Sequence, residues 1–121
     1  MLRNMLLAKI HRARVTSADL NYEGSITIDE DLMDAVGMLS YEKVQVLNIT
    51  TGARAETYTI PGQRGKGDIT MNGAIARMAC IDDLLIILAY GYIEEESAKK
   101  VTPKIIVLDE KNRIIKKLNI S

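Results

Sequence analysis

Residues 6–15 read LLAKIHRARV, and this stretch decides the fold. In its first half apolar and polar side chains alternate, with Ala8 and Ile10 on one face, as in a strand that turns one face toward a core. In its second half the apolar residues, Ala13 and Val15, are at odd-numbered positions and so would lie on the opposite face of a regular strand. One extra residue in the strand, a β-bulge, accounts for such a change. The stretch therefore predicts a long strand that is bulged or strongly twisted.

The rest of the chain alternates between short apolar runs and turn residues. Further strands are expected at 25–28, 43–50, 54–60, 68–71, 84–92, 104–108 and 113–118. Short helices are expected at 30–36, ending at Gly37, at 74–79 and at 94–100. About seven strands at short, regular spacing favour a barrel or a sandwich over a βαβ sheet. Without an internal repeat or a linker, residues 1–121 are expected to form a single, mainly β domain.

The composition excludes several classes of function. Sixteen basic and sixteen acidic residues cancel, and Phe and Trp are absent, which argues against nucleic-acid binding. One histidine and one cysteine exclude an HExxH zinc site, a cysteine-rich metal site and an intrachain disulfide, so no metal and a reducing cytoplasm are expected. No secretion signal is recognisable, and the longest apolar run, Leu84–Ile93, is too short for a membrane-spanning helix.

The stretch NYEGS, residues 21–25, is the one place where unusual chemistry is possible. Taken alone it is a common turn leading into a strand. A serine hydroxyl can, however, attack the carbonyl carbon of the residue before it and convert the amide bond between Gly24 and Ser25 into an ester. β-Elimination and hydrolysis then leave a pyruvoyl group at the new N-terminus. Glycine suits the attacked position because it tolerates strained dihedral angles.

Five blocks of the sequence stand out, namely KIHRARVTSADLNYEGS at 9–25, NITTGAR at 48–54, TY at 57–58, RG at 64–65 and NGA at 72–74. In this order and spacing they resemble the pyruvoyl-dependent aspartate decarboxylase family. Together they form a highly specific combination in a short chain. The resemblance covers roughly residues 1–90, whereas the chain beyond Glu94 matches only in general character.

The resemblance implies a small double-psi β-barrel of six or seven strands that assembles as a homotetramer with active sites at the subunit interfaces. It implies self-cleavage into residues 1–24 and 25–121, with the pyruvoyl cofactor formed from Ser25. L-Aspartate would form a Schiff base with this group, lose CO2 and leave as β-alanine, a precursor of pantothenate and coenzyme A. Spontaneous cleavage and cleavage assisted by a maturation factor are both compatible with the sequence.

The resemblance also implies roles for individual residues. Tyr58 would donate a proton to the substrate carbanion, and Thr57 would assist cleavage by a hydrogen bond to the Gly24 carbonyl. Substrate-binding positions are Lys9, Arg54, Thr57, Asn72, Gly73 and Ala74, and supporting positions are His11 and Tyr22. Plainer roles exist for most of them: a solvated lysine or arginine, a structural histidine, and an Asn-Gly turn. By the period of a strand, Arg54 and Tyr58 share one face and Thr57 takes the other.

Three residues depart from the family pattern, namely Ile26, Leu47 and Ile75. They leave the cleavage site intact but bear on substrate preference. One alternative is a β-barrel binding module without chemistry, which the combined YEGS, Arg54 and Thr57–Tyr58 positions disfavour. A second alternative is a pyruvoyl enzyme for another small amino acid, such as glutamate. The sequence does not separate this second alternative from aspartate.

Overall fold

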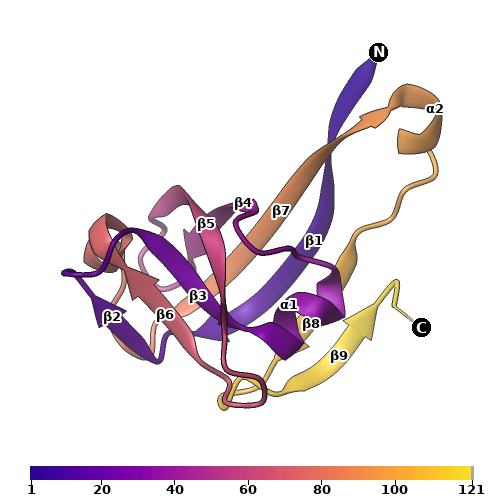
Figure 1. Ribbon diagram of the computed structural model, residues 1–121. Coiled ribbons are helices and arrows are strands. Elements are labelled where there is room, and N and C mark those ends of the chain that lie inside the picture. Colours follow the sequence, from indigo (N-terminus) through magenta and orange to yellow (C-terminus); the bar gives the residue numbers. More distant parts are fainter. Residues whose placement is uncertain (121) are drawn as a thin grey trace.

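Nine strands and three short helices make up the fold of residues 1–120, the part of the chain that the computed structural model describes (Figure 1). The strands are β1 (Leu2–Arg14), β2 (Ser17–Asp19), β3 (Ser25–Asp29), β4 (Lys43–Asn48), β5 (Arg54–Gly62), β6 (Ile69–Asn72), β7 (Leu84–Glu94), β8 (Lys104–Leu108) and β9 (Ile114–Leu118). The helices are α1 (Glu30–Val36), the 3₁₀ helix η1 (Gly73–Met78) and α2 (Glu95–Ala98). Strands dominate, which confirms the mainly β class with short helices.

The strands form one mixed sheet in the order β2-β6-β3-β5-β4-β7-β1-β8-β9. The pairs β1–β8, β2–β6 and β3–β5 are parallel, and the other neighbours are antiparallel. Because β2 and β9 are the two edges, hydrogen bonds do not close the sheet. A double-psi barrel is compatible with this mixed sheet and stays a prediction.

The sheet has one strand more than the eight ranges that the sequence pattern predicts, and more than the six or seven strands that the resemblance implies. The strand that the sequence pattern does not predict is β2, whose three residues are all exposed, so that no alternation of apolar and polar side chains marks it. It pairs with β6 in parallel, and Thr16, just before it, both donates to and accepts from the backbone of Ile69. This contact fixes the start of β6 against the end of β1.

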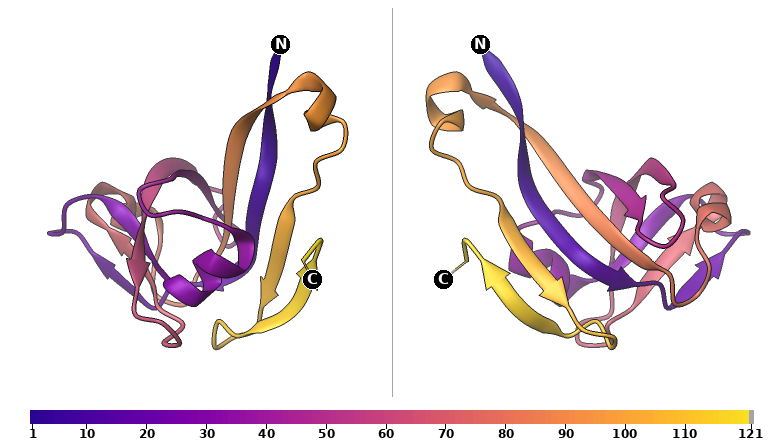
Figure 2. Two further views of the ribbon diagram at one scale, coloured as in Figure 1. Left: turned by 45° about the vertical axis from the view of Figure 1, so that its right-hand side comes forward. Right: turned by 180° about the vertical axis from the view of Figure 1, so that it is seen from behind.

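The bulge predicted in β1 is confirmed. The pairing of β1 with β7 shifts register between His11 and Ala13, and Arg12 between them has a φ of 67°. Residues on both sides of the bulge, including Ile10 and Ala13, are fully buried. β1 and β7 run together as a long ribbon, and their end near α2 projects beyond the other strands (Figures 1 and 2).

The core is built from aliphatic side chains on one face of the sheet, as the absence of Phe and Trp requires. Its largest fully buried members are Ile10, Ile26, Ile28, Met33, Ile69, Met71, Leu85, Ile87, Ile106, Val15, Val44 and Val46. Helix α1 contributes Met33 and runs from Glu30 to Val36, as predicted. Gly37 ends it in the left-handed conformation at a φ of 77°.

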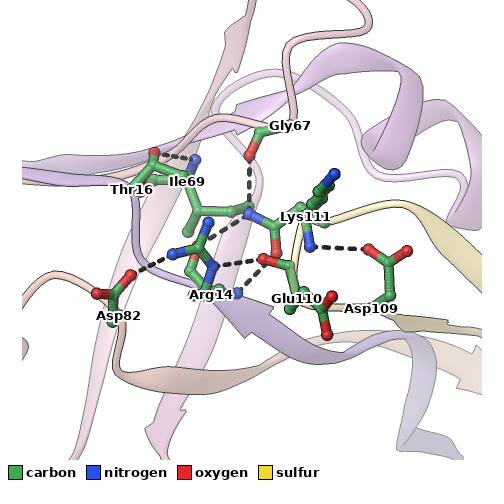
Figure 3. Close-up of polar contacts among 9 residues, drawn as sticks. Arg14, Thr16, Gly67, Ile69, Asp82, Asp109, Glu110 and Lys111 are labelled. Atoms are coloured by element: carbon green, nitrogen blue, oxygen red, sulfur yellow. Dashed lines mark hydrogen bonds and ion pairs between the residues drawn. The ribbon is translucent and has the colours of Figure 1, made fainter.

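A polar cluster at the end of β1 joins three distant segments (Figure 3). Asn112, in the turn between β8 and β9, accepts a hydrogen bond from the Arg14 backbone N–H at 2.8 Å. Its amide donates to the carbonyl oxygens of Arg14 and Gly67. The Arg14 guanidinium in turn bonds to the Glu110 carbonyl and pairs with Asp82. The cluster anchors the loop that leads into β6.

No helix among residues 1–120 is both long enough and apolar enough to cross a membrane.

Candidate active site

Ser25 begins β3 in an unusual conformation. Its φ is 125°, in a region that residues with a side chain rarely adopt, at a cost of about 1–3 kcal/mol. The residue is fully buried, whereas Gly24 before it is exposed. The peptide bond predicted to break thus joins an exposed turn to a buried, strained serine.

Asn72 lies directly opposite Ser25, in the antiparallel register of β3 and β6. Its Nδ2 donates hydrogen bonds to Ser25 Oγ at 3.1 Å and to Thr27 Oγ1 at 2.9 Å. Asn72 is only 3% exposed. Two of the residues named from sequence are therefore in contact, and Thr27 joins them. Thr27 was not among the site residues predicted from the sequence. Its spacing of two residues from Ser25, which puts both side chains on the same face of β3, is the one feature of the sequence that indicates it.

Gly73 follows Asn72 and touches the turn that carries Gly24. Its φ is 65°, and a β-carbon at this position would lie 2.7 Å from both the Gly24 nitrogen and the Tyr22 carbonyl oxygen. Only glycine fits such a close approach of two backbones. Ala74, the next residue of η1, is exposed. Tyr22, Gly24, Ser25, Asn72 and Gly73 are thus brought together.

β5 runs parallel to β3 and carries Thr57 and Tyr58. The first residues in register are Ile26 and Thr59, so Ser25 and Tyr58 occupy the preceding positions of neighbouring strands. The burial pattern puts Thr57 on the core face and Tyr58 on the opposite face, as predicted. Tyr58 is 38% exposed, and its ring centroid lies 6.3 Å from that of Tyr41.

The predicted cationic residues lie farther away, on the sheet face opposite the core. This outer face carries Lys9 and His11 of β1 and Arg54 of β5, which alternate with core-facing neighbours. His11 pairs with Ile86, Ile86 with Leu47, and Leu47 with Arg54, so these four residues form one row across four strands. At about 4.8 Å per strand the row is about 14 Å long.

Within one chain, the predicted cationic residues are therefore separated along the sheet from the residues around Ser25. Arg54 is four residues from Tyr58 along β5, about 13 Å at the rise of a strand. Lys9 and His11 lie on β1, which is four places from β3 in the sheet order. Ser25, Asn72 and Tyr58 form one group, and the cations are separate from it.

His11 is the histidine of the outer face, and its ring is partly buried. Nδ1 is buried without a hydrogen-bond partner among the described residues. Burial first, then the charges of Lys9 and Arg12, lowers the pKa of His11 from its ordinary value. A neutral imidazole is therefore favoured on a face that already carries positive charge.

The three departures from the family pattern occupy different environments. Ile26 is fully buried on the core face, and Ile75 of η1 is 8% exposed. Leu47 lies on the outer face, in the row beside Arg54. Leu47 is thus the departure that neighbours a predicted substrate-binding residue.

A sequence model of the family described as aspartate decarboxylase matches residues 1–115. The chain belongs to the aspartate decarboxylase family. This family consists of carboxy-lyases, which makes the chain an enzyme of that class.

Several aspartate decarboxylases are similar to this chain along nearly their whole length. An aspartate 1-decarboxylase of Carboxydothermus hydrogenoformans is 59% identical over 116 residues, which cover 96% of this chain and 91% of the relative. One of Bacillus licheniformis is 56% identical, with 94% of this chain and 90% of the relative covered. One of Bacillus cereus is 56% identical over 98% of this chain and 93% of the relative.

Proposed function

We propose that this enzyme decarboxylates L-aspartate to β-alanine and CO2, with a pyruvoyl group made from its own Ser25. The observation that carries the proposal is the buried Ser25 at a φ of 125°, hydrogen bonded by Asn72 at 3.1 Å, in a chain of the aspartate decarboxylase family. A strained serine next to a glycine is a fitting start for cleavage of the bond between them.

Self-cleavage is proposed to begin at the Ser25 hydroxyl. Ser25 Oγ attacks the Gly24 carbonyl carbon, the C–N bond breaks as its nitrogen takes up the hydroxyl proton, and an ester joins Gly24 to the serine side chain. Loss of the Ser25 Cα proton then breaks the Cβ–O bond and frees residues 1–24 as a carboxylate. Water replaces the nitrogen at Cα, and ammonia leaves. The first step relieves the strained backbone at Ser25, and the Asn72 N–H stabilises the negative charge on Oγ as it loses its proton, before that charge passes to the Gly24 carbonyl oxygen.

Thr57 is proposed to assist the first step by donating a hydrogen bond to the Gly24 carbonyl oxygen. Its strand runs parallel to β3, with Thr59 in register with Ile26, which puts Thr57 and Gly24 at equivalent distances before this pair. The structure of residues 1–120 contains no hydrogen bond between the two groups.

The residues around position 25 fit the proposed cofactor. The Asn72 amide that donates to Ser25 Oγ would donate equally to a carbonyl oxygen at this residue. When formed, the pyruvoyl group supplies an electron sink, the task that pyridoxal phosphate performs elsewhere. Tyr58 on the neighbouring strand is proposed to hold the proton that the substrate carbon receives, and the backbone of Gly73 and Ala74 to line the substrate.

Substrate binding is proposed to require a second copy of the chain. Aspartate has two carboxylates, for which Arg54 and Lys9 are suitable partners. On the outer face of one chain Arg54 lies four residues along β5 from Tyr58, and Lys9 lies on β1, four places from β3 in the sheet order. A homotetramer in which one copy supplies Ser25 and Tyr58 and its neighbour supplies Lys9 and Arg54 resolves this separation. His11 and Tyr22 would then support the site from either side.

The proposal extends to the setting of the enzyme. The chain acts as one domain in the cytoplasm, and its β-alanine supplies pantothenate and coenzyme A. Maturation occurs at the Gly24–Ser25 bond, either spontaneously or with a helper protein.

The test is an assay of purified, fully cleaved protein with L-aspartate and, separately, L-glutamate. We expect CO2 and β-alanine from aspartate, and at least tenfold less CO2 from glutamate. The Ser25→Ala variant serves as the control and should release none. Faster release of CO2 from glutamate than from aspartate would show that aspartate is not the preferred substrate. Release of no CO2 from either amino acid would overturn the proposed reaction.

A further inference from the structure

We propose that Thr27 is a positioning residue for self-cleavage, because its hydroxyl holds the Asn72 amide in the orientation that directs an N–H at Ser25 Oγ. The inference rests on the proposed function, since it assigns a role in the cleavage of the Gly24–Ser25 bond. It concerns a residue outside the set that the family resemblance indicated.

The geometry of the three side chains carries the inference. Asn72 Nδ2 has two hydrogens, fixed in the amide plane, and two acceptors within hydrogen-bond distance. Thr27 Oγ1 lies at 2.9 Å and Ser25 Oγ at 3.1 Å. Both acceptors belong to β3 and share one face of it, opposite the buried Ile26 and Ile28. With one hydrogen bonded to Thr27, the direction of the other is set toward Ser25.

Burial makes this arrangement sensitive to the loss of Thr27 Oγ1. Asn72 is 3% exposed, so water does not readily replace a missing acceptor. A buried N–H without a partner is unfavourable, and the amide would rotate to find one. Rotation moves the second N–H away from Ser25 Oγ. Oγ would then lose the donor that orients it and stabilises its negative charge as it gives up its proton in the first step of cleavage.

The sheet provides a matched control in Thr70. Thr70 lies directly opposite Thr27 on β6, on the same face. Its hydroxyl is hydrogen bonded to Ser17 at 2.9 Å rather than to Asn72. A change from threonine to valine at position 70 therefore removes a hydroxyl of the same kind, in the same pair of strands, without touching the Asn72 amide.

The experiment measures the rate at which freshly purified chain converts to residues 25–121, by intact mass. We expect Thr27→Val to slow cleavage about tenfold, which corresponds to the loss of one well-directed hydrogen bond. Thr27→Ser, which keeps the hydroxyl, and Thr70→Val should remain within about twofold of the wild type by the same reasoning. Thr27→Ala replaces Thr27→Val should the latter fail to fold, as judged by circular dichroism.

A double substitution separates positioning from a general structural effect. If Thr27 acts through Asn72, Thr27→Val should change the rate little in a chain that already carries Asn72→Ala. An undiminished effect in that background, or wild-type cleavage by Thr27→Val, would overturn the role of Thr27. Failure of the wild-type chain to cleave, even in extract of the source cells, would instead overturn the proposed cleavage of this bond, and the role of Thr27 with it.

Discussion

Gly73 packs against Gly24 so closely that a β-carbon on Gly73 would lie 2.7 Å from the Gly24 nitrogen. The end of β6 and the turn before the proposed cleavage bond therefore touch backbone to backbone. This contact keeps the turn over the residues that are proposed to line the substrate until the bond is cut. It also makes the turn sensitive to a single added methyl group.

The first prediction concerns Gly73→Ala. The new β-carbon would displace the turn of residues 22–24, so we expect cleavage at least tenfold slower than in the wild type. Gly52→Ala is the matched control, because Gly52 also has a positive φ, 80°, but nothing lies within 4 Å of its β-carbon position. In both variants an alanine at a positive φ costs about 1 kcal/mol of backbone strain. Only in Gly73→Ala does the added methyl group also collide with the backbone of residues 22–24. Intact mass against time compares them, and equal rates would contradict the account.

Much of the fold was predictable from local patterns. The alternation and parity change of residues 6–15 indicated the bulged strand, and Gly37 indicated the end of α1. These features depend on neighbours in the sequence. The three-residue β2 has no such pattern, because pairing with the distant β6 alone defines it.

The candidate site was predictable only in part. The roles of Ser25, Asn72 and Tyr58 came from a family resemblance, and the strand period assigned faces only to Arg54, Thr57 and Tyr58. That Asn72 stands opposite Ser25 depends on the register of β3 and β6, which joins residues 47 apart in sequence. The separation of Arg54 and His11 from Ser25 depends on the strand order of the whole sheet, which no local pattern contains.

A second prediction concerns the buried carboxylate of Asp29. It accepts hydrogen bonds from the backbone N–H groups of Asp31, Gly65 and Gly67, and so both caps α1 and holds the loop before β6. Asp29→Ala leaves three donors without their partner, and we expect a loss of about 3 kcal/mol in the free energy of unfolding. Asp31→Ala removes an exposed ion pair with Arg64 and should cost less than about 1 kcal/mol. Urea unfolding measures both, and similar losses would refute the assigned role of Asp29.

A third prediction follows from the lowered pKa of His11. The folded protein binds a proton at this imidazole less readily than the unfolded chain, whose histidine has a pKa of about 6.5. The contribution of the neutral His11 to the free energy of unfolding is therefore fully present above that pH, and it is lost as the pH drops below it. His11→Gln, which does not titrate, should therefore lose less free energy of unfolding than the wild type between about pH 7.5 and about pH 5.5. Parallel curves for the two proteins would contradict the lowered pKa.

A fourth prediction tests the shared active site. Ser25→Ala and Arg54→Ala chains should each be inactive alone. Coexpressed, they should regain about a quarter of wild-type activity, since random mixing leaves both required residues intact at one site in four. A mixture of Ser25→Ala with the double variant Ser25→Ala/Arg54→Ala is the negative control. An inactive first mixture would mean that one chain supplies the whole site.

The most direct test of the central claim is the intact mass of the purified protein under denaturing conditions, after a warm incubation. The account predicts two chains, residues 1–24 and 25–121, with the larger one lighter by one ammonia than a chain that begins with an ordinary serine. That difference is the mass signature of a pyruvoyl group at position 25. A single uncut chain of full mass, even after incubation in extract of the source cells, would contradict the account.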